Sequence, residues 1–311
     1  MRRLLFLILF SILVPIIIIS MFFKCNINKI ITGFNSNKIE EKDIFVRVLK
    51  SDNTVENIEL EKYIIGVVSS EMPVTFEIEA LKAQAVASRT YALKQMENNK
   101  DKEYDVTDNT LSQVYSTDDE LKERWGDNYQ ENYNKIEKIV KDTKSEYISY
   151  DDNFIYAFFF STSNGYTEDN VNVFGADLPY LKSVNSEFDK EENSNFEYTV
   201  NFDKTEFYNK IGLDYSDELK ISNERRSDSN RILYLEVNGV SFKGRELQKL
   251  LGLRSNDYTI EEKDDCITIT TKGFGHGVGM SQYGSNALAK QKKTYIDILK
   301  YYYQGVDIKK L

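Results

Sequence analysis

The sequence of 311 residues contains little of what builds metal centres and disulfide frameworks. It has two cysteines, Cys25 and Cys266, and a single histidine, His276. Two distant thiols and one imidazole are too few ligands for a Cys-based zinc site, and a bridge between the two cysteines is not expected. A metal-dependent peptidase is disfavoured as well, because one histidine cannot complete a His-Glu-x-x-His motif. The sequence therefore predicts no metal and no other cofactor.

Positive charge is also scarce. The chain has 40 lysine and arginine residues against 50 aspartate and glutamate residues, a net charge of -10 and a pI of about 5.0. This balance disfavours a nucleic-acid partner, since binding to phosphates needs a basic surface. A local basic cleft can still exist on an acidic protein, so an anionic substrate is compatible with the composition.

One long apolar run, residues 4–23, follows Arg2 and Arg3 and predicts a membrane anchor. Twenty helical residues at ~1.5 Å per residue span the ~30 Å hydrocarbon core of a bilayer. A cleaved signal peptide would end in an Ala-x-Ala site, and no alanine precedes Ala80. We expect an uncleaved single-pass anchor in the cell membrane, with the bulk of the chain outside the cytoplasm.

Beyond the anchor, short strand and helix patterns follow one another without a βαβ rhythm, so we predict an α+β fold. The predicted strands are 44–49, 146–150, 154–160, 196–202 and 266–270, with a hairpin over 233–242. The predicted helices are 60–69, 77–96, 134–141, 204–211 and 244–251, one from residue 282, and 295–303. Residues 97–130 and 161–184 are expected to be loops, and the acidic segment 186–197 to be mobile.

We divide the chain into an anchor (1–23), a linker (24–42) and a folded region (43–311). Within the folded region, residues 186–270 form either a second lobe or an elaboration of one core. We favour two lobes that flank a substrate groove.

The first candidate site is Glu71, in a Ser-Glu-Met-Pro motif just before an alanine-rich helix. Five of the nine alanines lie within residues 80–92, which indicates a helix packed closely on more than one side. Apolar neighbours raise the pKa of a carboxyl group, so Glu71 is a candidate general acid. Lys82 and Arg89 are seven residues apart and therefore share one helix face.

A glycine cluster, residues 273–284, holds five of the 15 glycines together with His276, Gln282 and Tyr283. Alternate glycines let a backbone bend tightly and approach a ligand. The cluster is not a Walker loop, because no Gly-Lys-Ser/Thr follows, and no βαβ unit surrounds it as in a Rossmann fold. A single histidine is usually structural, but one among glycines has few side chains to pack against.

Two further polar segments are weaker candidates. The hydroxyl loop, residues 161–170, includes Ser161, Ser163 and Tyr166 and suits carbohydrate recognition, although an ordinary polar loop would look the same. The segment 105–115 contains Asp108, which could be a second carboxylate.

In this order, the four clusters resemble the family of stage II sporulation protein D and the related amidase enhancers of bacterial cell walls, over residues 44–311. The resemblance implies a lytic transglycosylase that cleaves denuded peptidoglycan glycan strands between N-acetylmuramic acid and N-acetylglucosamine during engulfment. It implies a mother-cell membrane location that faces the intermembrane space. It also implies two partners, a cell-wall amidase of the stage II sporulation protein P type and a polytopic membrane protein of the stage II sporulation protein M type.

The resemblance also assigns roles to residues of this sequence. Glu71 matches the catalytic acid/base. The matching groove-lining residues are Lys82, Arg89, Ser161, Ser163, Tyr166, His276, Gln282 and Tyr283. Some relatives bind zinc through Cys and His in the fourth cluster, where this chain has Thr107, Leu111 and Ser112. Phe160 stands where many relatives have histidine, so no zinc is expected here.

The chemistry of one carboxylate is consistent with this interpretation. A glycoside hydrolase usually needs two carboxylates, whereas a transglycosylase uses the muramic 6-hydroxyl as an intramolecular nucleophile and can work with one. Lys82 and Arg89 would bind the lactyl carboxylate that is free once the stem peptide is removed. Two alternatives stay open: a non-catalytic glycan-binding enhancer of an amidase, and a true hydrolase that uses Glu71 with Asp108.

Overall fold

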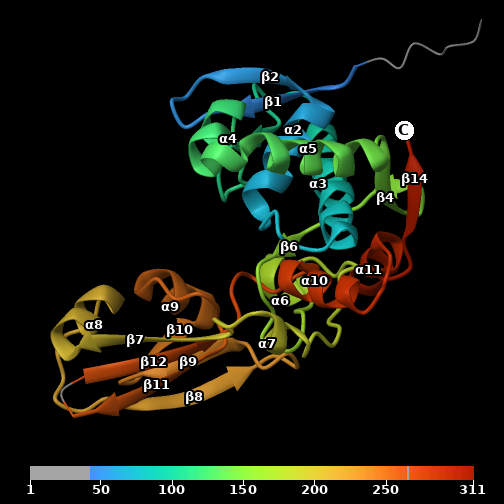
Figure 1. Cartoon of the computed structure of the whole chain (residues 1–311). Helices are drawn as coiled ribbons and strands as arrows, with labels where there is room; N and C mark the ends of the chain where they lie inside the picture. The colour runs from blue at the N-terminus through green and yellow to red at the C-terminus, as the bar shows by residue number, and fades with distance from the viewer. Residues whose placement is uncertain (1–42, 265) are drawn as a thin grey trace, which may run out of the picture. The chain divides into compact units, whose positions relative to one another are not determined.

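The computed structural model describes residues 43–264 and 266–311, and Figure 1 shows the arrangement of their helices and strands. The predicted anchor (1–23) and linker (24–42) lie outside the described residues. Within those two described ranges, no helix combines the length and the hydropathy needed to cross a membrane. Residues Phe45–Leu311 form one compact unit of mixed α+β structure, as the irregular pattern of strands and helices predicted.

The alanine-rich helix α3 (Ile78–Asn98) is central to the helical part of the unit. It packs against α2 (Leu60–Glu71), α5 (Tyr129–Asp142), α10 (Gln282–Lys290) and α11 (Tyr295–Tyr302). All five alanines between residues 80 and 92 are completely buried, because only a methyl group lets so many neighbours approach one helix. The prediction of a helix packed on several sides is confirmed.

Two small sheets accompany these helices. One contains β1 (Phe45–Leu49) between antiparallel β2 (Val55–Glu59) and parallel β3 (Val106–Thr107). The other contains β4 (Glu146–Tyr150) between β5 (Asn153–Phe154) and the C-terminal β14 (Asp307–Lys310). Val46 and Val48 are fully buried, as the alternating pattern of the first strand requires.

The sheet-rich part of the unit, residues 197–272, contains two three-stranded sheets and two helices. One sheet has the order β11 (Tyr258–Lys263), β12 (Cys266–Lys272), β7 (Glu197–Asp203). The other has the order β10 (Val240–Lys243), β9 (Ile232–Val237), β8 (Ile221–Arg226). Helices α8 (Lys204–Ile211) and α9 (Gly244–Leu251) have the bounds that the sequence predicted, and their apolar faces join both sheets in one core cluster.

The hairpin turn between β9 and β10 follows the Asn-Gly signal. Asn238 has φ 48° and Gly239 has φ 83°, so both central residues are in the left-handed region. This is the backbone of a type I′ turn, whose twist matches that of the flanking strands.

A short parallel pairing brings together two segments that are distant in sequence. Strand β6 (Phe159–Phe160) pairs with β13 (Met280–Ser281), so the start of the hydroxyl loop lies beside the end of the glycine cluster. Helix α10 begins directly after β13, and its N-cap Ser281 accepts a hydrogen bond from the backbone of Gly284. The hydroxyl loop then continues into α6 (Asn170–Phe174).

Four local predictions are wrong, and one of them is the loop 161–184, which contains α6. Residues 97–130 are not mostly loop, because α4 (Asp118–Trp125) forms there behind a capping box of Thr117 and Glu120, followed by the 3-10 turn η1 (Gly126–Asn128). The helix has only one buried residue, Leu121, so it lacks the apolar stripe by which a helix is recognised. In place of the predicted strand 154–160, the structure has two short strands, β5 and β6, with an irregular segment between them.

The acidic segment 186–197 is also more ordered than expected. It contains α7 (Asp189–Glu192), and the carboxylate of Asp189 is fully buried. This carboxylate accepts hydrogen bonds from the hydroxyls of Ser163, Ser186 and Ser281. A buried charge with several donors holds the segment in place, which the charge pattern alone could not show.

Candidate functional site

Glu71 is the last residue of α2, and Pro73 stands two positions after it. Met72 is extended, with φ -128° and ψ 144°, so the helix ends here and the Glu71 side chain leaves its last turn. Oε1 of Glu71 accepts a hydrogen bond from the backbone N–H of Val114 at 2.7 Å. Oε2 accepts a second from Nε2 of Gln282 at 3.2 Å. Two segments from distant parts of the sequence therefore fix the orientation of one half-buried carboxyl group.

Burial raises the pKa of Glu71 above its ordinary value, and the hydrogen bonds from Val114 and Gln282 offset part of that rise. Desolvation disfavours the carboxylate, and no charged side chain of the described residues contributes to the shift. A carboxyl group that keeps its proton to higher pH is suited to donate it to a leaving oxygen.

Asp108 does not form a pair with Glu71. Its carboxylate accepts hydrogen bonds from the backbone and the hydroxyl of Ser51, both at 3.1 Å, and lies 3.6 Å from Nζ of Lys50. These partners belong to the turn between β1 and β2. The prediction of Asp108 as a second catalytic carboxylate does not fit this geometry.

Arg89 is not available to a substrate, and its predicted place in the groove is wrong. Its side chain has 0% exposure, and its guanidinium forms a bidentate pair with Glu61 at 2.9 and 2.6 Å. Nη1 also donates to the carbonyl oxygen of Glu146 at 3.1 Å. At Arg89, the helix face that it shares with Lys82 is therefore buried against neighbouring elements. The bidentate pair with the carboxylate of Glu61 makes this burial of the guanidinium tolerable.

The ammonium of Lys82 is engaged by carboxylates. Nζ lies 3.2 Å from Glu79 and 3.9 Å from Asp142, and 5.9 Å from the ring centre of Tyr295. None of these three partners contacts the carboxyl group of Glu71. Binding of substrate by Lys82 stays a prediction.

Three of the other predicted residues lie around Glu71. Gln282 is buried and donates to Glu71 directly. The next residue, Tyr283, packs edge-on against Phe76 at 5.1 Å between ring centres, and its backbone N–H donates to the carbonyl of Ser161 at 3.0 Å. The parallel pairing of β6 and β13 thus joins the hydroxyl loop, the glycine cluster and the Ser-Glu-Met-Pro motif at one place.

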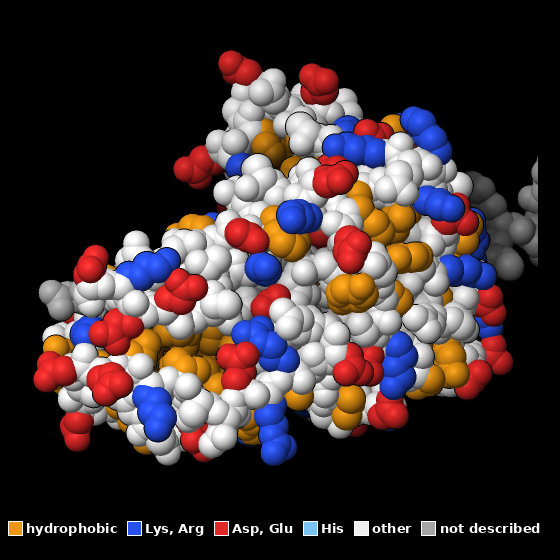
Figure 2. All heavy atoms as spheres, turned by 90° about the horizontal axis from the view of Figure 1, so that it is seen from below, with side chains coloured by type: hydrophobic (Ala, Val, Ile, Leu, Met, Phe, Trp, Pro, Cys, Tyr) orange, Lys and Arg blue, Asp and Glu red, His pale blue; other side chains and the backbone are white. Residues whose placement is uncertain are grey.

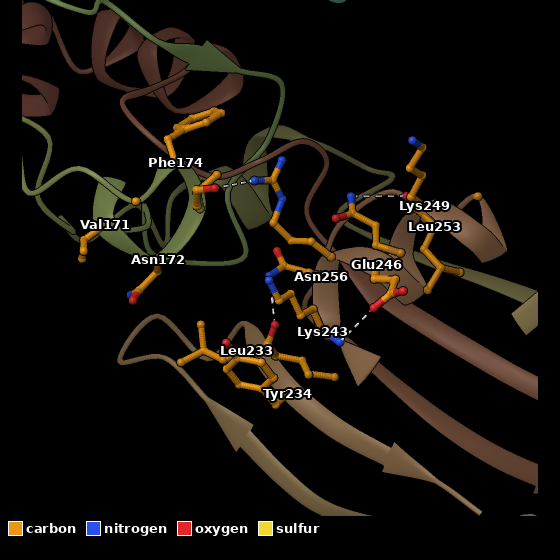
Figure 3. Close-up of a pocket in the computed structure, with 16 residues that line it drawn as sticks. Val171, Asn172, Phe174, Leu233, Tyr234, Lys243, Glu246, Lys249, Leu253 and Asn256 are labelled. Carbon is orange, nitrogen blue, oxygen red and sulfur yellow. Dashed lines mark hydrogen bonds between the residues drawn. The ribbon is translucent and has the colours of Figure 1, made fainter. Parts of the chain in front are cut away.

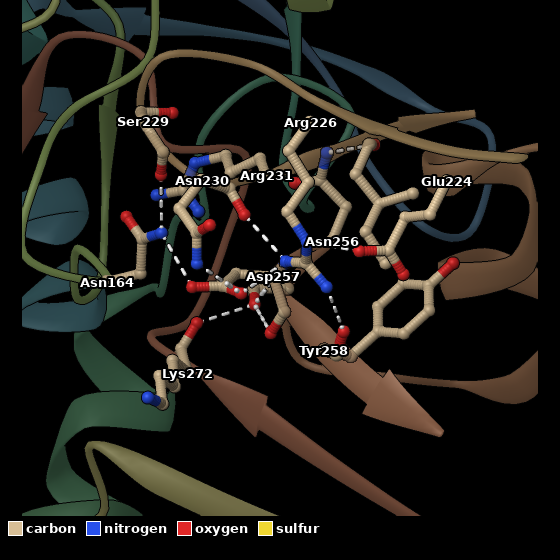
Figure 4. Close-up of polar contacts among 12 residues, drawn as sticks. Asn164, Glu224, Arg226, Ser229, Asn230, Arg231, Asn256, Asp257, Tyr258 and Lys272 are labelled. Atoms are coloured by element: carbon tan, nitrogen blue, oxygen red, sulfur yellow. Dashed lines mark hydrogen bonds and ion pairs between the residues drawn. The ribbon is translucent and has the colours of Figure 1, made fainter. Parts of the chain in front are cut away.

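The rest of the hydroxyl loop mainly supports the fold. Ser163 is fully buried and donates to Asp189 at 2.8 Å, so it cannot line a groove, and that prediction is wrong. Asn164 donates to Asp257 and to the carbonyl of Ser229, both at 2.7 Å, within the polar network drawn in Figure 4. Arg226 contributes to the same network through Asp257 at 2.9 Å. Tyr166 is 41% exposed, and its hydroxyl lies 3.5 Å from Glu187.

His276 packs among aromatic rings and stays neutral. Its ring centre lies 6.1 Å from that of Phe158, 5.7 Å from Phe160 and 5.3 Å from Phe174. Burial, followed by the positive charges of Arg245 and Arg231, lowers the pKa of His276 to about 3. Nδ1 accepts a hydrogen bond from the backbone of Val278 at 3.1 Å. The contacts therefore show the ring as a packing element of the site, with its charged form disfavoured.

The motifs gave no indication of an aromatic row, defined here as Tyr91, Tyr156, Phe158 and Phe174. Ring centres are 6.4 Å apart between Tyr91 and Phe158, 5.8 Å between Tyr156 and Phe158, and 4.6 Å between Phe158 and Phe174. Burial raises the pKa of the Tyr91 phenol, and the charge of Glu71 adds a smaller rise. The run of aromatic residues at 156–160 is the sequence feature that accompanies this row, but by itself it predicts only a strand.

The segment around Thr107, Leu111 and Ser112, for which no zinc was expected, is a polar turn. The backbone N–H of Thr107 donates to the hydroxyl of Ser112 at 3.0 Å, and Leu111 is exposed. Among the residues that the structure describes, no group of three or more His, Cys, Asp or Glu side chains is placed to hold a metal ion.

Comparison with known proteins agrees with the motifs. A model of the family described as stage II sporulation protein matches residues 49–150. Stage II sporulation protein D of Bacillus amyloliquefaciens is 44% identical over 276 residues, which cover 87% of this chain and 80% of that protein. The protein of the same name from Bacillus subtilis (strain 168) is 45% identical over 265 residues, with 83% and 76% covered.

A more distant relative is the protein named amidase enhancer from Bacillus subtilis (strain 168). It is 28% identical over 297 residues, which cover 78% of this chain but 40% of that protein. The two stage II sporulation protein D sequences are similar enough to this chain, over enough of their length, to be members of the same family. The chain belongs to the family of stage II sporulation protein D.

Proposed function

We propose that this protein is a lytic transglycosylase that cuts peptidoglycan glycan strands, with Glu71 as its acid and base. The observation that carries the proposal is the isolation of Glu71. It is a half-buried carboxyl group with a raised pKa, held by two neutral donors, and no second carboxylate contributes to its environment among the residues described. A glycoside hydrolase usually needs a second carboxylate as nucleophile or base, whereas a transglycosylase does not.

In the first step, the protonated Glu71 donates its proton to the glycosidic oxygen between N-acetylmuramic acid and N-acetylglucosamine. The bond between that oxygen and the anomeric carbon of the muramic residue breaks. In the second step, the Glu71 carboxylate accepts the proton of the muramic 6-hydroxyl while O6 bonds to the anomeric carbon. The product is a 1,6-anhydro sugar, Glu71 is again protonated, and no water is consumed. The nucleophile belongs to the same sugar, so proximity replaces the second protein carboxylate.

Gln282 and Val114 act in both steps by keeping each carboxyl oxygen in place. Their donors favour the carboxylate that forms after the first proton transfer, while burial favours the neutral acid before it. The partly exposed members of the aromatic row, Tyr156, Phe158 and Phe174, offer ring faces on which the apolar faces of sugars can stack.

We further propose that this activity serves sporulation, on strands from which an amidase has removed the stem peptides. The support is membership of the stage II sporulation protein D family and similarity to a protein named amidase enhancer. An amidase of the stage II sporulation protein P type and a membrane protein of the stage II sporulation protein M type are the proposed partners. The apolar run at residues 4–23 supports a location in the mother-cell membrane.

The test is mass spectrometry of the products formed from peptide-free glycan strands by the full chain in detergent, beside Glu71→Gln. Glutamine has nearly the same shape but cannot donate an acid proton, so a folded variant isolates the chemistry. We expect anhydro-muramic ends with the native protein and none with the variant. Reducing ends would instead mean hydrolysis and would overturn the proposal.

A second candidate, a glycan-binding enhancer without its own chemistry, is favoured by the similarity to the amidase enhancer. It predicts intact strands that the protein nevertheless binds, and unchanged stimulation of an amidase by the Glu71→Gln variant. The same pair of proteins therefore separates the two functions.

A further inference from the structure

A pocket of about 900 Å³ lies outside the surroundings of Glu71, between α6, β9 and α9. Figure 3 shows Val171, Asn172 and Phe174 on one wall, Leu233 and Tyr234 on another, and residues of α9 opposite. Small-molecule sites commonly have volumes of roughly 300–1,000 Å³. This pocket, called here the basic pocket, is large enough for sugar residues.

The charge of the basic pocket is opposite to that of the whole protein. Lys243, Arg245 and Lys249 line it with Glu246, which leaves an excess of two positive charges on a chain of net charge -10. On the face shown in Figure 2, acidic and basic side chains are interspersed. Both lysines are exposed, and neither ammonium forms an ion pair with any residue in the described part of the chain. Such cations attract an anionic ligand.

Arg245 is held in place at the pocket wall. Its Nη1 donates to the carbonyl of Val173 at 2.8 Å, and its guanidinium lies 5.5 Å from the ring centre of Phe174. One of its five N–H donors is thereby used, so others remain for a carboxylate.

The pocket also offers apolar faces and an unused acceptor. Phe174 is 46% exposed and Tyr234 is 48% exposed, which leaves ring surface open to a ligand. Asn256 lines the pocket and is almost completely buried, and its Oδ1 has no hydrogen-bond partner among the described residues. A buried acceptor without a partner is costly, and a hydroxyl or amide N–H of a ligand would satisfy it.

Phe174 belongs both to this pocket and to the aromatic row. A ligand in the pocket can therefore be continuous with one on the aromatic row. Rings to stack on, hydrogen-bond acceptors and excess positive charge together match one chemical class, an acidic polysaccharide.

We propose that the basic pocket binds a part of the glycan strand remote from the bond that is cut, and that it recognises a free lactyl carboxylate of muramic acid. The proposal rests on the proposed function only for the identity of the strand. It gives this protein a means to prefer strands without stem peptides, since a peptide bond removes the carboxylate charge. The groups that carry this preference are Lys243, Arg245 and Lys249, and Arg89 has no part in it.

The experiment measures binding in the Glu71→Gln background, so that no strand is cut. The probes are denuded glycan strands with free lactyl carboxylates and the same strands after conversion of these groups to neutral amides. The variant is Lys243→Ala with Lys249→Ala. The matched control is Lys100→Ala with Lys141→Ala, two exposed lysines outside the pocket.

We expect the pocket variant to bind the carboxylate strands roughly fivefold more weakly, as for two exposed charge contacts. It should bind the amide strands as the parent protein does, and the difference should fade at high salt. The control should bind both probes like the parent. Equal weakening on both probes, or no weakening on either, would overturn the proposal.

The result is independent of the chemistry at Glu71. If the native protein cuts no glycan but the pocket variant still loses affinity for the carboxylate strands, the transglycosylase proposal fails and the binding site stands. If the native protein produces anhydro ends but the pocket variant binds normally, the binding site fails and the transglycosylase proposal stands.

Discussion

Replacing Gln282 with leucine tests how Glu71 is controlled. The substitution keeps the approximate size of the side chain but removes the donor 3.2 Å from Oε2 of Glu71. That hydrogen bond favours the carboxylate, so its loss raises the pKa of Glu71 further above its ordinary value. Hydrogen bonds to charged groups contribute about 1.5–3 kcal/mol, and at this length we take about 1 kcal/mol. A change of about 1 kcal/mol corresponds to about 0.7 pH unit.

The assay is the pH dependence of kcat/KM for release of anhydro-muramic ends. Glu71 must be protonated to act as an acid, so activity falls as the pH rises through its pKa. In Gln282→Leu this alkaline limb should move to higher pH by about 0.7 unit, and kcat should fall because the carboxyl group is less well oriented. Gln291→Leu is the control, since Gln291 caps the other end of α10 and is exposed. An alkaline limb that stays in place in folded Gln282→Leu would refute the role assigned to this contact.

Three further predictions concern Glu71, Arg89 and Phe174. Because the pKa of Glu71 is raised on folding, its ionisation destabilises the native state as the pH rises through that pKa. Glu71→Gln should therefore melt at a higher temperature than the native protein at pH 8. A gain in melting temperature that persists at pH 4 would contradict the reasoning. Arg89→Met leaves the partly buried Glu61 without its partner and should lower the free energy of unfolding by about 3–5 kcal/mol in urea titrations. Adding Glu61→Gln should restore part of that loss. A stable Arg89→Met variant with altered glycan preference would argue against a structural role for Arg89. Phe174→Ala removes a half-exposed ring and should weaken glycan binding by about 1 kcal/mol in calorimetry. Because the ring also packs on Phe158 and His276, the free energy of unfolding should fall by about 1 kcal/mol, with the protein still folded. Unchanged affinity of the folded variant would exclude Phe174 from the binding surface.

Local patterns in the sequence by themselves determined several features of this protein. The alanines of α3 required close packing, the Asn-Gly pair required a type I′ turn, and α8 and α9 begin and end where their periodicity and following glycines indicated. The motif around Glu71 identified the residue that the structure places in a half-buried, two-donor setting. These features depend on neighbours within a few residues, so the local sequence is enough to predict them.

The tertiary structure alone decided which polar residues meet. Gln282 reaches Glu71 across 211 positions of sequence, through the pairing of β6 with β13. Arg89 and Ser163 look like site residues in the motifs, but each is buried against a carboxylate, Glu61 and Asp189. The aromatic row and the basic pocket also combine segments that lie far apart in the chain. Burial and long-range contact set whether a polar side chain binds substrate or supports the fold, and neither is encoded in local spacing.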